Sequence, residues 1–195
     1  MIDYQFFYSG PLLFNTTIKE SDLIEIEKLC NTDVDYSEHL AAAIESQNKI
    51  NALHYREILS PYIEIYKQAF EEWYGDKITK NILIEDAWVN FMKKNDFQPP
   101  HIHPSSYIAS VLFLTDLNDK VKKERDNYKG THPGGPASLN FIFSTNQLNN
   151  FIQERHFAPS RGQLYMFPGS LFHYVFPYKS DFTRISVAAN FNFER

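Results

Sequence analysis

Residues 167–193 read FPGSLFHYVFPYKSDFTRISVAANFNF, and the alternation of side chains within this stretch predicts the fold class. Two segments rich in aromatic and β-branched residues, 172–176 and 183–193, follow a Pro-Gly turn and are typical of β-strands. Successive side chains of a strand point to opposite faces, so the second segment would have one polar and one apolar face. The polar face would carry Arg184, Ser186, Ala188, Asn190 and Asn192, and the apolar face Ile185, Val187, Ala189, Phe191 and Phe193.

Four stretches further upstream have the same character, being short, apolar and bounded by Gly, Pro, Asn or Asp. They cover residues 82–91, 107–114, 137–143 and 163–167. Several short strands that follow a helical front predict an α+β protein built on a double-stranded β-helix, a jelly-roll or cupin-like barrel. The N-terminal helices are expected to pack on its major sheet.

The front of the chain is expected to begin with strands at 3–8 and 11–18, joined by a turn at residues 9–11. Ser21 and Asp22 would then cap a helix that ends near Cys30. Residues 38–50 favour a helix through their three alanines, but no residue fixes its ends.

The clearest helix runs from His54 to Tyr74. Apolar residues recur there at steps of three and four and would form one stripe against the sheet, namely Ile58, Tyr62, Ile65, Ala69 and Trp73. Gly75 would end the helix, and Pro61 would break or kink it near Ser60.

The bulk composition indicates one soluble domain over residues 1–195, with a supporting front at 1–80 and the barrel at 82–193. A net charge of −5 argues against general binding to nucleic acid, because no large cationic surface is implied. The single cysteine, Cys30, excludes an internal disulfide and is expected to be a core residue. Neither a signal peptide nor an apolar run of membrane-spanning length is found, so the expected location is the cytoplasm.

A histidine pair, His101-Ile102-His103, lies in the proline-rich stretch 99–104. Residues i and i+2 of an extended chain point the same way, and the flanking prolines favour extended backbone. Both imidazoles could therefore bind one metal ion. Taken alone, the pattern also fits two exposed histidines in a proline-rich loop.

Two later residues could complete a site. His173 follows the Pro-Gly turn and could return over the histidine pair, although a core histidine bonded to a backbone carbonyl is the alternative. Arg184 comes eleven residues later. Inside a barrel its guanidinium would need an anion, and a carboxylate held with the help of Ser186 would supply one. A solvated polar face is the other interpretation.

In this order and spacing, the motifs resemble those of the iron(II)- and 2-oxoglutarate-dependent dioxygenases. They are most similar to a branch of 2OG-Fe(II) oxygenases from bacterial and phage genomes, which share W-x-N, H-x-H-P, FP with a following histidine, R-x-S and a terminal N-F. Here the motifs are Trp88-Val89-Asn90, His101-Ile102-His103-Pro104, Phe167-Pro168 with His173, Arg184-Ile185-Ser186 and Asn190-Phe191. The resemblance covers residues 82–193.

The resemblance implies roles for the residues of these motifs. Iron(II) would be bound by three metal ligands, His101, His103 and His173. The cosubstrate 2-oxoglutarate would be bound by Arg184 and Ser186, with Asn90 bonded to the cosubstrate or to a ligand. The implied activity is that of a hydroxylase-type oxygenase that couples decarboxylation of 2-oxoglutarate to oxidation of an unidentified substrate.

The third metal ligand is an open point. The wider superfamily uses two histidines and a carboxylate, so Asp96 or Asp116 could replace His103 in that role. The shared side of the extended chain favours His103.

Two other functions stay open at the level of sequence. A cupin-like metal enzyme that does not use 2-oxoglutarate would also fit three histidines, and a non-enzymatic jelly-roll module could carry them incidentally. The substrate could be a protein side chain or a small molecule. The charged segment 118–135 is expected to be a structureless loop, mobile or acting as a lid. Four aromatic residues could form an apolar wall or simply core, namely Tyr107, Phe113, Tyr165 and Phe172.

Overall fold

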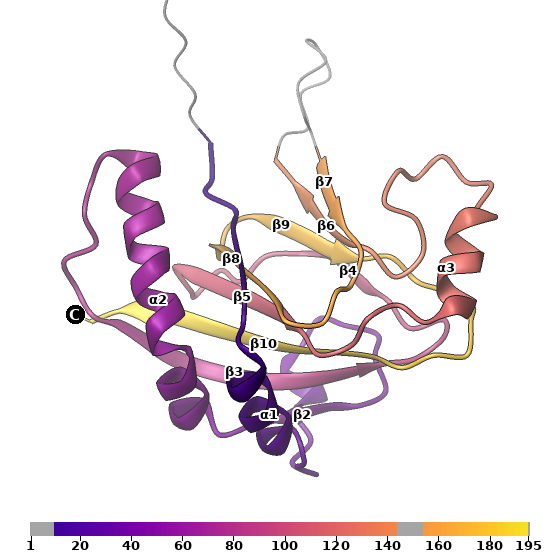
Figure 1. Cartoon of the computed structure of the whole chain (residues 1–195), viewed down its shortest axis with the longest axis horizontal. Coiled ribbons are helices and arrows are strands. Elements are labelled where there is room, and N and C mark those ends of the chain that lie inside the picture. The colour runs from indigo at the N-terminus through magenta and orange to yellow at the C-terminus, as the bar shows by residue number, and fades with distance from the viewer. Residues whose placement is uncertain (1–9, 144–153, 195) are drawn as a thin grey trace, which may run out of the picture.

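The computed structural model of the protein describes residues 10–143 and 154–194, so the strand expected at 3–8 lies outside the described residues. Its strands form two sheets (Figure 1). The six-stranded major sheet has the order β1 (Phe14–Thr17), β8 (Gln163–Pro168), β5 (Ile108–Phe113), β10 (Arg184–Phe193), β3 (Ile82–Met92) and β2 (Gln47–Lys49). The four-stranded minor sheet has the order β4 (Gln98–His101), β9 (Phe172–Val175), β6 (Leu139–Ile142) and β7 (Glu154–Phe157).

Strands β3 to β10 have the connectivity of a rolled-up hairpin. The β6–β7 pair forms the closed end of this hairpin. Counting outward from that end, each strand before it pairs antiparallel with the corresponding strand after it. Thus β5 pairs with β8, β4 with β9 and β3 with β10. This arrangement is a jelly roll, and it confirms the predicted double-stranded β-helix.

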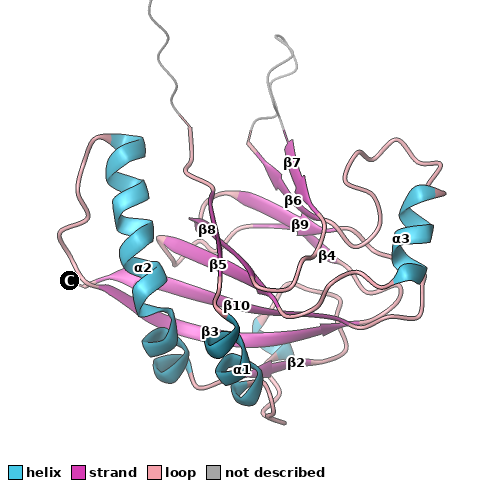
Figure 2. Cartoon of the chain, in the orientation of Figure 1, coloured by secondary structure: helices cyan, strands magenta, loops and turns pink. Residues whose placement is uncertain are grey.

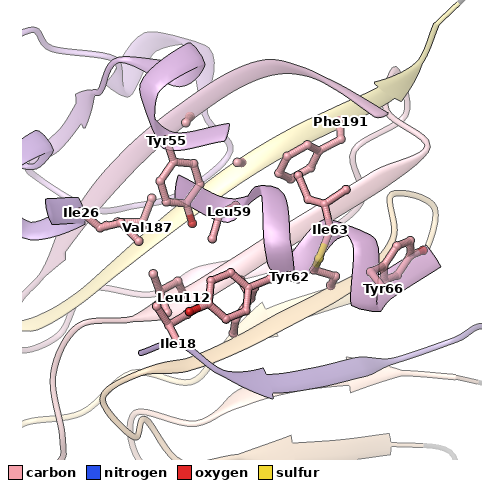
Figure 3. Packing of buried hydrophobic residues seen from close by; sticks show 14 of the residues in the cluster. Ile18, Ile26, Tyr55, Leu59, Tyr62, Ile63, Tyr66, Leu112, Val187 and Phe191 are labelled. Carbon is pink, nitrogen blue, oxygen red and sulfur yellow. The ribbon is translucent and has the colours of Figure 1, made fainter. Parts of the chain in front are cut away.

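Helices α1 (Glu20–Leu29) and α2 (Ala52–Tyr74) cover one face of the major sheet, and the minor sheet lies on the other face (Figure 2). The five buried residues of α2 share one apolar cluster with Leu112 of β5 and with Val187 and Phe191 of β10 (Figure 3). The five are Tyr55, Leu59, Tyr62, Ile63 and Tyr66.

Three of the five residues in the predicted stripe on α2, Ile58, Tyr62 and Ala69, lie in or against the apolar cluster, but the other two do not. Ile65 and Trp73 are each 45% exposed, and the buried face is turned toward Tyr55, Leu59 and Tyr66. Tyr55 and Tyr66 were left out of the predicted stripe, although a tyrosine can bury its ring while its hydroxyl group forms a hydrogen bond.

The predicted end of α2 at Gly75 is confirmed, whereas the helix begins at Ala52, two residues before the predicted His54. Gly75, with φ of 71°, ends α2, but the helix continues through Pro61 instead of breaking at Ser60. Helix α1 has Lys19 as its N-cap without a side-chain cap. Asp22, expected to cap it, instead accepts a hydrogen bond from the Tyr62 hydroxyl at 2.6 Å.

Two segments of uncertain structure are now assigned. Residues 38–50 contain a 3₁₀ turn (Ser37–His39) and β2, so no helix forms at the alanines. The structureless loop expected at 118–135 is wrong, because it contains α3 (Asp119–Asp126). Val121 of α3 is fully buried, and Glu124 accepts hydrogen bonds from the backbone N–H groups of residues 179 and 180. Among the described residues, no helix is long and apolar enough to cross a lipid bilayer.

Candidate active site

Three histidines meet between the two sheets. His101 ends β4 and His173 lies in β9, and they are opposite partners across this antiparallel pair. His103 follows β4 and is held by its backbone N–H, which donates to the Gly169 carbonyl at 2.8 Å. One potential ligand atom from each histidine lies within 4.8 Å of the others, and in the described part of the chain this group includes no carboxylate.

The Pro-Gly turn before β9 lets the two histidine segments approach closely. A Cβ atom on Gly169 would lie 2.8 Å from the His103 carbonyl oxygen and closer still to that of Ser106. Any larger residue would therefore push the backbone that carries His103 away from His173.

Backbone hydrogen bonds to the Nδ1 atoms of two imidazoles leave the lone pairs of their Nε2 atoms for other partners. Nδ1 of His101 lies 2.8 Å from the Pro99 carbonyl oxygen, and Nδ1 of His173 lies 2.9 Å from that of Leu171. Each Nδ1–H therefore donates to backbone, so each Nε2 carries the lone pair, and that of His101 accepts a hydrogen bond from the Gln98 side-chain amide at 3.1 Å. Nε2 of His103 lies 3.3 Å from Nε2 of His173. This donor set fits a divalent transition metal.

Burial keeps these imidazoles neutral. It lowers the pKa of His101, and it lowers the pKa of His173 well below the usual range, with the other two imidazoles adding to the second effect. Burial, reinforced by His101, lowers the pKa of His103 to about 4. A neutral imidazole is the form that binds metal, so the site is ready for an ion at pH 7.

The two carboxylates considered as a third ligand have other partners. Asp96 accepts a hydrogen bond from the backbone N–H of Lys93 at 2.8 Å. Asp116 accepts one from the backbone N–H of Arg161 at 2.9 Å. Neither belongs to the histidine group, which supports His103 as the third candidate.

Arg184 is a buried cation with open hydrogen-bonding capacity. The residue is 2% exposed, and its Nη1 donates to the Ser186 hydroxyl at 3.1 Å. Among the described residues, its Nε and Nη2 have no partner, and no carboxylate forms an ion pair with it. The guanidinium carbon lies 4.8 Å from the centroid of the Phe113 ring. Burial lowers the Arg184 pKa to about 10, so the guanidinium stays charged at pH 7. A buried charge is costly unless an anion pairs with it.

Asn90 lies beside Arg184 because of the strand register, in which Asn90 is opposite Ser186. Its Oδ1 accepts a hydrogen bond from Nε2 of Gln47 at 2.6 Å, and its Nδ2 lies 3.4 Å from the Ser186 carbonyl oxygen. Gln47 is fully buried on β2, so its hydrogen bond fixes the orientation of the Asn90 amide.

Two cavities adjoin these residues. A deep one is lined by five of the six predicted site residues, namely Asn90, His103, His173, Arg184 and Ser186. An outer one is lined by the sixth, His101, and again by His103. The deep cavity measures about 10 Å³ and the outer one about 390 Å³. Trp88, Gln98 and His103 line both, so they form the partition between the cavities.

Three residues with a part in this site were missed as site residues from sequence. Gln47 lies in a stretch that predicted no definite element, and its contact with Asn90 is long-range. Gln98 contacts Nε2 of His101 at 3.1 Å and could have been found by its place three residues before His101. Tyr178 accepts a hydrogen bond from the backbone N–H of Arg184 at 3.3 Å. Of the four predicted wall residues, Phe113 and Tyr165 are buried, whereas Tyr107 and Phe172 are 66% and 50% exposed.

Several solved structures share the fold of this chain. An oxidoreductase of the 2OG-Fe(II) oxygenase family from Burkholderia pseudomallei has a TM-score of 0.58 at 15% identity, over 94% of this chain and 84% of that one. A prolyl-4-hydroxylase from Pseudomonas putida has a TM-score of 0.54 at 13% identity, over 94% and 93%. HygX from Streptomyces hygroscopicus, solved with nickel and 2-oxoglutarate bound, has a TM-score of 0.52 at 9% identity, over 94% and 82%.

At the level of sequence, one family model matches this chain. It is described as "Putative 2OG-Fe(II) oxygenase" and matches residues 86–190, which include every predicted site residue. No curated protein matches the chain.

Proposed function

This chain belongs to the 2OG-Fe(II) oxygenase family, and we propose that it hydroxylates a substrate while decarboxylating 2-oxoglutarate. Iron(II) would be held by His101, His103 and His173, and the cosubstrate by Arg184, Ser186 and Asn90. One observation carries the proposal: the unpartnered, buried donors of Arg184 adjoin the cavity that two of the three histidines line.

The donor set balances the charges of the two ligands. Three neutral imidazoles leave the full charge of the ion, which a dianionic cosubstrate offsets. Arg184 would take the far carboxylate of 2-oxoglutarate with Nε and Nη2, a bidentate geometry that lysine lacks. When bound, iron(II) supplies the redox chemistry that dioxygen and 2-oxoglutarate require.

The walls of the deep cavity strengthen this binding. Val111, Leu139 and Val175 line it, so a carboxylate there meets Arg184 in a site of low dielectric constant. At about 10 Å³ the cavity holds roughly one water molecule. Entry of the cosubstrate therefore requires that Trp88 or Gln98, in the partition, change conformation.

The set of three histidines also fits a cupin-like enzyme that does not use 2-oxoglutarate. Arg184 separates the two functions, since an enzyme without an anionic cosubstrate has no use for a buried guanidinium with two free donors.

Metal binding is tested first. His101→Ala and His173→Ala should each abolish stoichiometric binding of iron(II) under anaerobic conditions without unfolding the protein. His54→Ala, at an exposed position of α2, is the matched control and should bind normally. A full equivalent of metal in both site variants would show that the ligand assignment is wrong.

The third ligand has its own test. His103→Asp should still bind iron(II), because it recreates two histidines and a carboxylate. His103→Ala should bind it more weakly than the parent protein. Equal affinity of His103→Ala and the parent would mean that another residue is the third ligand.

Cosubstrate binding is tested by Arg184→Ala, which should keep its metal and lose about 3–5 kcal/mol of 2-oxoglutarate affinity. Arg184→Lys should lose less, since a point charge remains. The measurement is an anaerobic titration of the iron–2-oxoglutarate charge-transfer band, with Arg155→Ala, at an exposed position, as control. Unchanged affinity in Arg184→Ala would favour the cupin-like enzyme.

A further inference from the structure

The outer cavity next to the histidines has an acidic wall. Glu85 and Asp86 line it, and in the described part of the chain no lysine or arginine does. On β3 and β10 the charges are ordered along the strands, because Arg184 lies opposite Met92 while Asp86 lies six residues before Met92. At the rise of an extended chain this is roughly 20 Å. The end of the β3–β10 pair near Arg184, where the cosubstrate would bind, is thus cationic, and the end near Asp86, beside the outer cavity, is anionic.

A β-bulge brings two neighbouring carboxylates to this cavity. The register of β3 and β10 shifts after Asn190, which pairs with Asp86. The next residue of β10 pairs with Ile84, so Glu85 is the extra residue. Neighbours in a regular strand point to opposite faces, but a bulge re-aims a side chain. Both Glu85 and Asp86 can therefore line one cavity.

An ammonium group already occupies the edge of this wall. Nζ of Lys49 lies 3.0 Å from Oδ1 of Asp86 and 5.0 Å from the centroid of the Tyr36 ring. Tyr36 and Asp86 both line the cavity. A carboxylate beside an aromatic ring binds amines by charge and by cation–π attraction. The Lys49 side chain is 45% exposed, so it could leave this position without being buried elsewhere.

Two polar groups in the wall have no protein partner. Trp88 is 2% exposed, and its indole Nε1–H has no acceptor among the described residues. Oδ1 of Asn190, on the strand next to Asp86, has no donor there. Buried polar groups without partners are costly, so both are open to a ligand once the side chains that cover them move. The indole N–H of Trp88 would need an oxygen acceptor on that ligand, and Oδ1 of Asn190 would need an N–H donor.

We propose that the outer cavity selects substrates that carry a positively charged amino group and a nearby oxygen acceptor. The amine would take the place of the Lys49 ammonium at Asp86, with Asn190 as a second acceptor, and Trp88 would donate to the substrate oxygen. The inference rests on the proposed function, because the cavity leads to the candidate metal ligands. An anionic substrate would meet the two carboxylates of the wall and be disfavoured.

The test uses three capped amino acids of graded charge as probes. Nα-acetyl-lysinamide is cationic, Nα-acetyl-norleucinamide is neutral, and the amide of Nα-acetyl-glutamate is anionic. They are titrated into Trp73→Phe protein loaded with Zn²⁺ and 2-oxoglutarate. Since the chain has 2 tryptophans, Trp88 alone then reports binding by its fluorescence. The lysine probe should bind about tenfold more tightly than the norleucine probe, equal to about 1.4 kcal/mol, and the glutamate probe least tightly.

Two variants should change the affinity for the lysine probe in opposite directions. Asp86→Asn should weaken it about tenfold, whereas Lys49→Gln should strengthen it several-fold because it frees the carboxylate. A purely structural ion pair would give no gain in Lys49→Gln. The matched control is Asp181→Asn, at a carboxylate that is 89% exposed and outside the cavity.

Equal affinities for the three probes, absence of lysine-probe binding, or weakening in Lys49→Gln would each overturn the inference. The parent protein is titrated in parallel with iron(II) and 2-oxoglutarate. If that titration succeeds while the probes do not discriminate, the proposed function stands and the substrate class is wrong. If it fails, the proposed function itself is wrong.

Discussion

The two faces of the major sheet are made by alternate residues of the same strands, yet they have opposite properties. Toward α1 and α2, β10 presents Val187, Ala189 and Phe191, which are all fully buried in one apolar cluster (Figure 3). Toward the minor sheet, the same strand presents Arg184 and Ser186, also buried but charged or polar. A shift of one residue in the strand register would exchange these faces. The register therefore keeps the residues that stabilise the core on one face and the residues of the candidate site on the other.

The difference extends to how well buried polar atoms are satisfied. On the side of the minor sheet, Arg184, Trp88 and Asn190 keep polar atoms that have no partner in the described part of the chain, as a binding site requires. On the helix side, the buried hydroxyls without another hydrogen-bond partner among the described residues are those of Tyr55 and Ser110, and these two interact with each other. We therefore expect substitutions on the helix side to reduce stability and substitutions on the other side to reduce binding.

The largest effect is expected on the helix side. Leu59→Ala removes a fully buried side chain of α2 and should lower the free energy of unfolding by about 2–5 kcal/mol. Urea denaturation measures this loss, and Leu53→Ala, at a residue 71% exposed on the same helix, should change stability by less than about 0.5 kcal/mol. The folded fraction of Leu59→Ala should bind metal as the parent does. A matching loss of metal affinity would show that the two faces are coupled.

The opposite sign is expected at Arg184. In the protein free of metal and cosubstrate, Arg184→Met replaces a buried guanidinium without a counter-ion by an apolar chain of similar length. It should raise the free energy of unfolding by about 1–4 kcal/mol while abolishing 2-oxoglutarate binding. Thermal unfolding with and without metal plus 2-oxoglutarate measures both, since only a binding-competent protein gains stability from its ligands. A loss of stability like that of Leu59→Ala would make Arg184 a structural residue.

A smaller effect is expected at Gln47, the residue that is hydrogen-bonded to Asn90. Gln47→Leu leaves Oδ1 of Asn90 without its donor, so stability should fall by about 1–3 kcal/mol and 2-oxoglutarate should bind more weakly. Metal affinity should not change, because no candidate ligand contacts Gln47 in the described structure. The control is Gln68→Leu, at an exposed position of α2. Unchanged 2-oxoglutarate affinity in Gln47→Leu would separate Asn90 from cosubstrate binding.

The smallest effect near neutral pH concerns Cys30, on the helix side. Burial, with a contribution from Glu27, raises the pKa of its thiol from 9.0 to about 12. The folded protein therefore keeps this proton while the unfolded chain loses it, so stability should fall as the pH rises from 9 toward 12. Below pH 9, iodoacetamide should label Cys30 only as fast as the protein unfolds. Rapid labelling of folded protein at pH 8 would contradict its assignment to the core.

Sequence predicted what local periodicity and spacing determine. The alternation along residues 183–193 placed Arg184 and Ser186 on one face, and the H-x-H spacing placed His101 and His103 on one side of an extended chain. The predicted strand at 82–91 is β3, which ends only one residue later. These features depend on neighbours in the chain, which a sequence displays directly.

Features set by distant partners were not predictable in the same way. The buried face of α2 depends on which side chains the sheet accepts, and the role of Gln47 depends on Asn90, 43 residues away. The strands β2 and β7 are too short to show a period. The β-bulge at Glu85 leaves no signal in β3 alone, because it is a mismatch with β10.

The rolled-up hairpin has a consequence for how the protein is made. Asn90 and Ser186 are 96 residues apart in the chain, yet they meet only when β10 enters between β3 and β5. During synthesis on the ribosome, a nascent chain that lacks β10 has neither the Arg184 donors nor the partner strand that orders Asn90. Cosubstrate cannot stabilise such an intermediate, and pairing over this distance places folding among the slow, millisecond-to-second cases. Until then the unpaired edges of β3 and β5 are exposed to other chains, so chaperones should act on this protein before its ligands can.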